Sequence, residues 1–143
     1  MIVYTFREAR APGRTSHTGR TSQAMLEFAL AIPILLLLIM GIMDGGRWVI
    51  AETTLVNATR EAARFAVVRY PNVDWNTGGA SAGRNAAVGL AAQDLGIAVS
   101  TEISGQDSYV VVHGQYTFRP ITPGLTWLTA QIPMNAQTRM LVQ

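Results

Sequence analysis

One carboxylate stands at the start of the most apolar stretch of the chain. Glu27 is followed directly by residues 28–43, which contain no charged side chain. If this stretch crosses a membrane, an acid at its edge costs roughly 3 kcal/mol unless a partner neutralises it, so a functional role is the default expectation. The alternative places Glu27 at the level of the lipid headgroups, where it only ends the apolar segment. Position alone leaves both interpretations open.

A second group of polar residues follows the other end of the stretch. Asp44 and Arg47 are three residues apart, so on a helix they share a face and can form an ion pair. The alternative is that both only mark the end of the apolar segment. Trp48 follows, and tryptophan favours the boundary between membrane and water. The three residues are therefore predicted to lie at a membrane boundary.

Other reactive groups are scarce. The chain has no Cys and two His, His17 and His113, which are far apart in the sequence. This composition excludes disulfides and thiolate sites, and it gives no spacing for a metal site or a Ser-His-Asp triad. The net charge of +2 does not indicate a nucleic-acid partner. We predict no enzyme activity, no cofactor and no metal.

The elements that carry these residues begin with a basic leader. Residues 1–22 hold four Arg against Glu8, are rich in Gly, Ser and Thr, and are expected to be disordered. The 16 residues 28–43 would span about 24 Å as a helix, short of a hydrocarbon core of about 30 Å. We therefore extend the predicted transmembrane helix to residues 23–50. The basic leader places the N-terminus in the cytoplasm. The core of the predicted transmembrane helix includes Phe28, Pro33, Leu37 and Met43.

Two alternatives to a membrane anchor remain at this stage. A buried core helix of a soluble protein is disfavoured because residues 35–40 are apolar on every face. A cleaved secretory signal peptide shares the basic start and the apolar run. However, the residues after the run offer no convincing Ala-x-Ala site, and the helical pattern continues beyond it.

The rest of the chain predicts a small α+β domain. Residues 51–69 continue the first helix with one apolar seam, and residues 70–143 form the exported domain. A loop over Tyr70–Gly79, a helix from Ser81 to about Leu95 and three antiparallel strands are expected. The predicted buried stripe of that second helix comprises Val88, Ala91, Ala92 and Leu95. The predicted strands are Ile97–Ile103, Tyr109–Phe118 and Ile132–Val142, with a hairpin turn at Gly105–Asp107 and a further turn at Thr122–Leu125.

Ser22–Pro33 resembles the start of TadE-like minor pilins (pseudopilins) of the tight-adherence, or Flp-type, pilus. Those proteins typically read Gly-Gln-x-x-x-Glu-Phe-Ala-x-x-x-Pro, and this chain has Ser22 where Gly is usual. The resemblance implies that a prepilin peptidase cuts between Ser22 and Gln23. Glu27 would then be the fifth residue of the mature chain and would meet the N-terminal amine of a neighbouring subunit. Further similar segments are Gly41–Arg47, Asn57–Arg64, Tyr116–Pro123 and Met134–Met140.

The resemblance also implies a function and a location. The protein would be a minor pilin that acts in assembly, initiation or the tip of the pilus, and so in surface attachment. Its expected partners are the prepilin peptidase, the pilus assembly platform, other minor pilins, the major pilin and inner-membrane lipid. It would cross the bacterial inner membrane once, with an exported C-terminal domain that becomes extracellular in the pilus. The alternatives are an uncleaved membrane-anchored sensor or accessory subunit, and a secreted binding module or small hydrolase.

Overall fold

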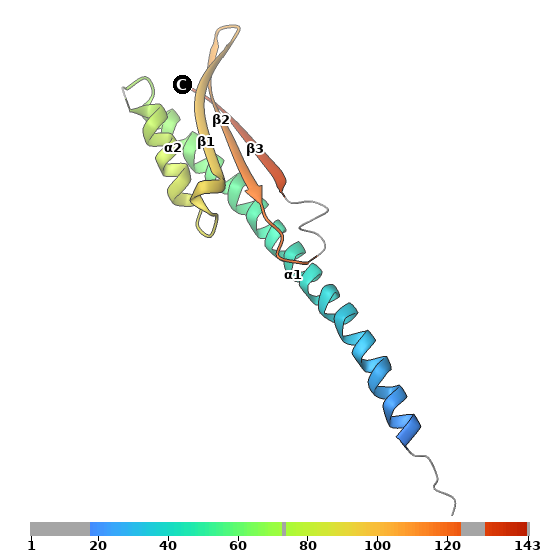
Figure 1. Cartoon of the computed structure of the whole chain (residues 1–143). Coiled ribbons are helices and arrows are strands. Elements are labelled where there is room, and N and C mark those ends of the chain that lie inside the picture. Colours follow the sequence, from blue (N-terminus) through green and yellow to red (C-terminus); the bar gives the residue numbers. More distant parts are fainter. Residues whose placement is uncertain (1–17, 73, 124–130, 143) are drawn as a thin grey trace, which may run out of the picture. The chain divides into compact units, whose positions relative to one another are not determined.

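The computed structural model describes residues 18–72, 74–123 and 131–142, with side chains from residue 22 onward. Contacts within the chain group it into two units, Met1–Leu36 and Leu37–Gln143. Figure 1 labels the helices and strands, which are α1 (Thr18–Arg69), α2 (Trp75–Ala86), β1 (Leu95–Ser104), β2 (Asp107–Phe118) and β3 (Ile132–Leu141). A short 3₁₀ turn (Ala92–Asp94) precedes β1. The predicted α+β class, with a long first helix and three antiparallel strands, is confirmed.

The helix α1 begins earlier than predicted. Residues 18–22 are helical, so the expectation of disorder is wrong for them, while residues 1–17 lie outside the described part of the chain. Adding residues to an existing helix is easier than starting one, and no Pro stands between Pro12 and Pro33. Pro33 itself lies inside α1.

The second half of α1 contributes a row of small side chains, the seam, to the hydrophobic core. Leu55, Ala58 and Ala62 are buried, as the spacing of apolar residues predicts, and Ala66 continues the seam. These alanines pack with Ile97, Val110 and Val112 of the sheet. Small residues on the helix let the sheet approach it closely.

The sheet has the order β1-β2-β3, with both pairs antiparallel. The predicted hairpin between β1 and β2 is confirmed, with Gly105 at φ 68°, a conformation that suits Gly. A side chain at Gly114 of β2 would collide with Thr59 of α1. The Thr59 hydroxyl lies 2.9 Å from that of Thr138 in β3, a hydrogen bond that joins α1 to the far strand.

The second helix differs from the prediction. α2 begins at Trp75, inside the predicted loop, and ends at Ala86. Gly79 and Gly83 are buried against α1, so tertiary packing outweighs their poor helix propensity. The predicted stripe is wrong, because Val88 is exposed and none of its members lies in α2. The helix expected to run to about Leu95 ends at Ala86 instead, and Leu95 and Gly96 lie within β1.

We predict that Gly83→Ala lowers the free energy of unfolding by about 1–3 kcal/mol, because the added atom overfills a tight contact. A Cβ there would lie 2.9 Å from the Cβ of Ala62 and from Cδ1 of Ile97. In an open helix the same change would stabilise by about 1 kcal/mol, so the sign of the effect is informative. Denaturant unfolding of the full chain in detergent micelles measures it.

Gly96→Ala is the matched control, since its Cβ would meet nothing closer than Gln115 Cβ at 3.9 Å. Equal stability of both variants would contradict the close packing of α2 on α1.

Candidate functional site

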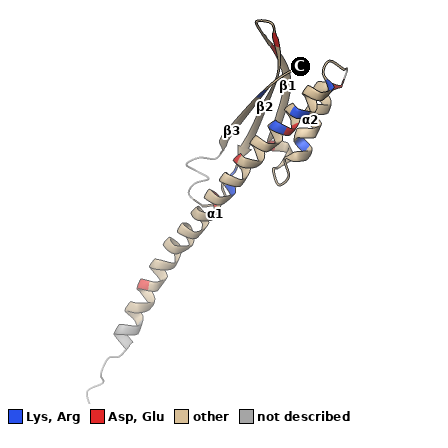
Figure 2. Cartoon of the chain, turned by 180° about the vertical axis from the view of Figure 1, so that it is seen from behind, with Lys and Arg blue, Asp and Glu red and all other residues tan. Residues whose placement is uncertain are grey.

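The apolar part of α1 is the first component of the site. The helix is long and apolar enough to cross a membrane, and its most apolar stretch is not buried within the structure. The predicted core residues Phe28, Leu37 and Met43 are exposed, as is Pro33. Figure 2 shows this stretch of α1 almost entirely free of charged residues. A helix with this exposed apolar surface suits lipid on all sides.

Glu27 lies on α1 one turn after Gln23. The side-chain amide of Gln23 donates a hydrogen bond of 3.2 Å to Oε1 of Glu27, and both side chains are exposed. The ion pairs of the described residues involve Asp44, Asp94 and Glu102, and none of them involves Glu27. The bond from a neutral amide leaves the carboxylate charge uncompensated.

Among the described residues, Asp44 is the acid whose carboxylate accepts the most hydrogen bonds. It is buried, with 5% of its surface exposed. Its carboxylate accepts hydrogen bonds from the backbone N–H of Ile121 at 2.8 and 3.1 Å, and from the N–H of Thr122 at 2.8 Å. The Thr122 hydroxyl donates a further bond of 2.7 Å. These donors all come from the segment that follows β2, so Asp44 fixes that segment to α1.

Arg47 also donates a hydrogen bond to the Asp44 carboxylate. Its guanidinium lies 2.9 Å from Asp44 Oδ1 and 5.3 Å from the ring centre of Phe118, the last residue of β2. The ion pair considered from the sequence is therefore present. The Arg47 side chain is 44% exposed, so solvent weakens its attraction to the buried carboxylate. Its stacking on Phe118 adds a second link between α1 and β2.

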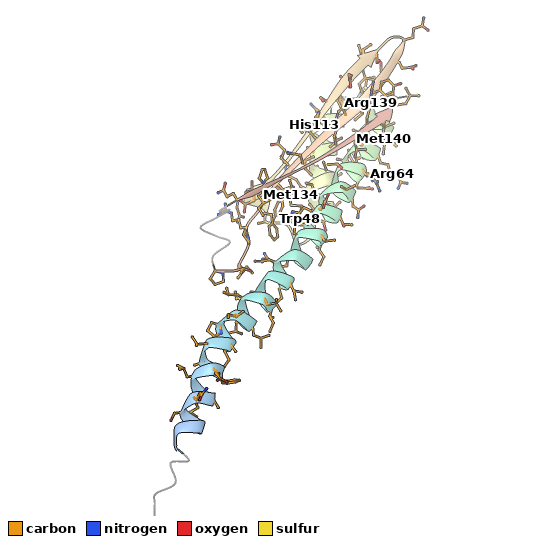
Figure 3. All side chains as sticks on the ribbon, turned by 90° about the vertical axis from the view of Figure 1, so that its right-hand side faces the viewer. Trp48, Arg64, His113, Met134, Arg139 and Met140 are labelled. Carbon is orange, nitrogen blue, oxygen red and sulfur yellow. The ribbon has the colours of Figure 1, made fainter. Side chains whose placement is uncertain are left out.

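A mostly apolar groove of about 420 Å³ lies beside Asp44. Gly41 and Gly45 form part of its wall, and a Cβ at either would meet nothing within 4 Å. Trp48 lines the same groove, and Figure 3 shows it close to Met134 at one end of the sheet. The remaining lining residues are Phe118, Pro120 and Ile132.

The structure thus brings Asp44, Arg47 and Trp48 together with the segment after β2. Their predicted position at a membrane boundary stays a prediction, as does the role of Glu27. Sequence reasoning missed Ile121 and Thr122 as partners of Asp44. The turn predicted from Thr122 was the available signal, but nothing in the sequence links it to an acid 78 residues earlier.

Comparison with protein families gives one result. Residues 23–64 match the model of the TadE-like protein family. The resemblance seen in the sequence is confirmed over this segment, which contains Glu27, the apolar run and Asp44. No curated protein and no solved structure matched the chain.

We predict that Asp44→Asn lowers the free energy of unfolding by about 2 kcal/mol, because it removes a charged acceptor from buried donors. The amide hydrogens of Ile121 and Thr122 should then exchange with solvent faster, while those of the sheet centre change little. Hydrogen-exchange mass spectrometry of the full chain in micelles measures both effects.

Asp74→Asn serves as the control, because Asp74 is exposed and its side chain makes no capping hydrogen bond to α2. Unchanged exchange at Ile121 and Thr122 in Asp44→Asn would show that the carboxylate does not hold this segment.

Proposed function

We propose that this protein is a minor pilin, or pseudopilin, of a tight-adherence pilus. It takes part in pilus assembly, at the initiation or the tip of the filament, and so in surface attachment. The observation that carries the proposal is the match of residues 23–64 to TadE-like proteins. The role is structural, and catalysis belongs to the peptidase that processes the chain.

The proposed processing site is the bond between Ser22 and Gln23. Cleavage there removes the basic leader, residues 1–22, and creates a new α-amine on Gln23. This bond lies within α1, four residues after the helix begins at Thr18. A peptidase needs access to the backbone, so α1 must unwind from Thr18 through the Ser22–Gln23 bond, which is more than one turn. Helix ends fray readily, which makes this a small requirement.

Glu27 is proposed to pair with the N-terminal amine of a neighbouring subunit. Its one described hydrogen bond comes from the neutral amide of Gln23, so the carboxylate charge still needs a cation. In an apolar bundle of helices, each charge alone is costly, and pairing removes much of that cost. Such a pair also fixes how far one helix is shifted along the next.

The proposed domain organisation follows from this role. Residues 1–22 form the cytoplasmic leader, 23–50 cross the inner membrane, 51–69 continue the helix and 70–143 form the exported domain. The leader carries a local charge excess of +3, which supports a cytoplasmic N-terminus. The partners would be the prepilin peptidase, the assembly platform, other minor pilins, the major pilin and inner-membrane lipid.

An uncleaved membrane-anchored sensor or accessory subunit is the second candidate function. The observation that favours it is Ser22, which occupies the position before the proposed cut where TadE-like minor pilins usually have Gly. A larger residue there would slow a peptidase that selects a small side chain.

We predict that the mature chain isolated from its native host starts at Gln23, as measured by mass spectrometry of the N-terminal peptide. Ser22→Gly should be cleaved at least as completely, and Ser22→Trp should accumulate uncut, because the bulky side chain would not fit a site that accepts small residues. A chain that retains Arg20 would favour the uncleaved anchor, and a start beyond about residue 46 would indicate secretion.

We predict that Glu27→Ala still inserts into the membrane but no longer co-assembles with partner pilins, because the amine of the neighbouring subunit loses its counter-charge. Membrane fractionation and co-purification with tagged partners in the native host measure the two effects. Glu52→Ala is the control, since Glu52 is an exposed acid of α1 outside the apolar run. Normal co-assembly of Glu27→Ala would remove the proposed role.

A further inference from the structure

The segment after β2 holds one exposed apolar side chain in a fixed place. Ile121 is bound to Asp44 through its backbone N–H at 2.8 Å, and the next residue adds two more bonds to the same carboxylate. The side chain of Ile121 takes no part in these bonds, and 61% of the residue is exposed. An apolar side chain is thus fixed at the surface by a polar anchor beneath it.

The anchor sets the level of Ile121 relative to the apolar helix. Asp44 directly follows Met43, the last residue of the uncharged run. Because Ile121 is hydrogen-bonded to Asp44, it lies at the same level as the end of that run. Residues 23–43 span about 31 Å as a helix, the thickness of a hydrocarbon core. If they occupy the hydrocarbon layer and residues 44–50 lie at the headgroups, Ile121 lies where hydrocarbon gives way to headgroups.

The residues nearest this level have the composition of a membrane interface. Trp48 is 39% exposed and stands one turn beyond Asp44. The guanidinium groups of Arg47 and Arg119 are paired with Asp44 and Asp94, yet their side chains remain 44% and 60% exposed. Tryptophan is favoured at this depth because its amphipathic ring suits the boundary, and long arginine side chains can extend their guanidinium groups to the headgroups.

We propose that Ile121 inserts into the boundary between headgroups and acyl chains, so that the exported domain touches the membrane at a second point beside α1. This contact rests on the membrane anchor of the proposed function. It restricts rotation and tilting of the domain on its helix. We favour lipid as the partner of Ile121 because this exposed side chain lies at the level where the apolar run of α1 ends.

Exposure alone would not single out Ile121, since Ile103 is 77% exposed. The two differ in their level within the sheet. Ile103 pairs with Ser108 near the β1–β2 hairpin, whereas Ile121 follows the opposite end of β2 at Phe118. These ends of the strand are about 33 Å apart along its length. Ile103 is therefore a matched apolar control outside the reach of the membrane.

Single-cysteine labelling tests the proposal, because the chain has no native Cys. The full-length variants Ile121→Cys, Ile103→Cys and Leu38→Cys would each carry the same environment-sensitive fluorophore. Each would be reconstituted at low protein density into vesicles of phosphatidylethanolamine and phosphatidylglycerol. Quenching is then measured with spin-labelled lipids, either near the headgroup or deep in the acyl chain, and with iodide on both sides of the membrane.

The label at position 121 should be quenched best by the shallow spin label and several-fold less by iodide than the label at position 103. Strong iodide quenching without spin-label quenching would overturn the contact. Protection from both quenchers would overturn it too, because it would show that protein covers Ile121. The label at Leu38, about 9 Å from Asp44 along α1, reports the anchor separately. If it escapes the deep spin label, the proposed membrane anchor fails as well.

Discussion

A buried carboxylate needs donors, and the way Asp44 obtains them determines how the domain is assembled. It accepts bonds from a segment 77 and 78 residues downstream, and Arg47 links the same carboxylate to the end of β2. The apolar seam of α1 cannot do this alone. Ala58, Ala62 and Ala66 repeat at nearly regular steps, so a sheet could shift along them with a small loss of packing. Directional bonds at Asp44, and at Thr59 with Thr138, specify one position.

The predictable parts of the fold are those determined by local patterns. The seam of α1, the hairpin at Gly105 and the alternation of β3 follow directly from residue periodicity and turn chemistry. The start of α2 does not. Its glycines predict a loop by propensity, but their missing side chains let α2 pack on α1, and that packing decides the conformation. Such a contact between distant segments is invisible in a single sequence.

The same division holds for the candidate site. The sequence identifies Glu27, Asp44, Arg47 and Trp48, because a charge or a tryptophan beside an apolar run is unusual enough to be noticed. It does not reveal Thr122, whose importance comes only from the fold. The TadE-like match extends from residue 23 to residue 64 and so lies within α1. The matched segment contains Glu27, the apolar run, Asp44 and much of the small-residue seam. It does not contain the sheet that covers the seam.

Because Asp44 and its donors are far apart in the sequence, the bonds between them can form only late in the synthesis of the chain. Residue 44 leaves the ribosome well before residue 122. The Asp44 carboxylate and the alanine seam therefore emerge before the sheet and the segment after β2, which bury them. Until β2 and the following segment arrive, the apolar stripe of α1 faces solvent and the Asp44 carboxylate can bond only to water. The domain is therefore completed only after β3, which ends at Leu141, has been synthesised. During that interval the exposed stripe can associate with other apolar surfaces, because their burial away from water is favourable.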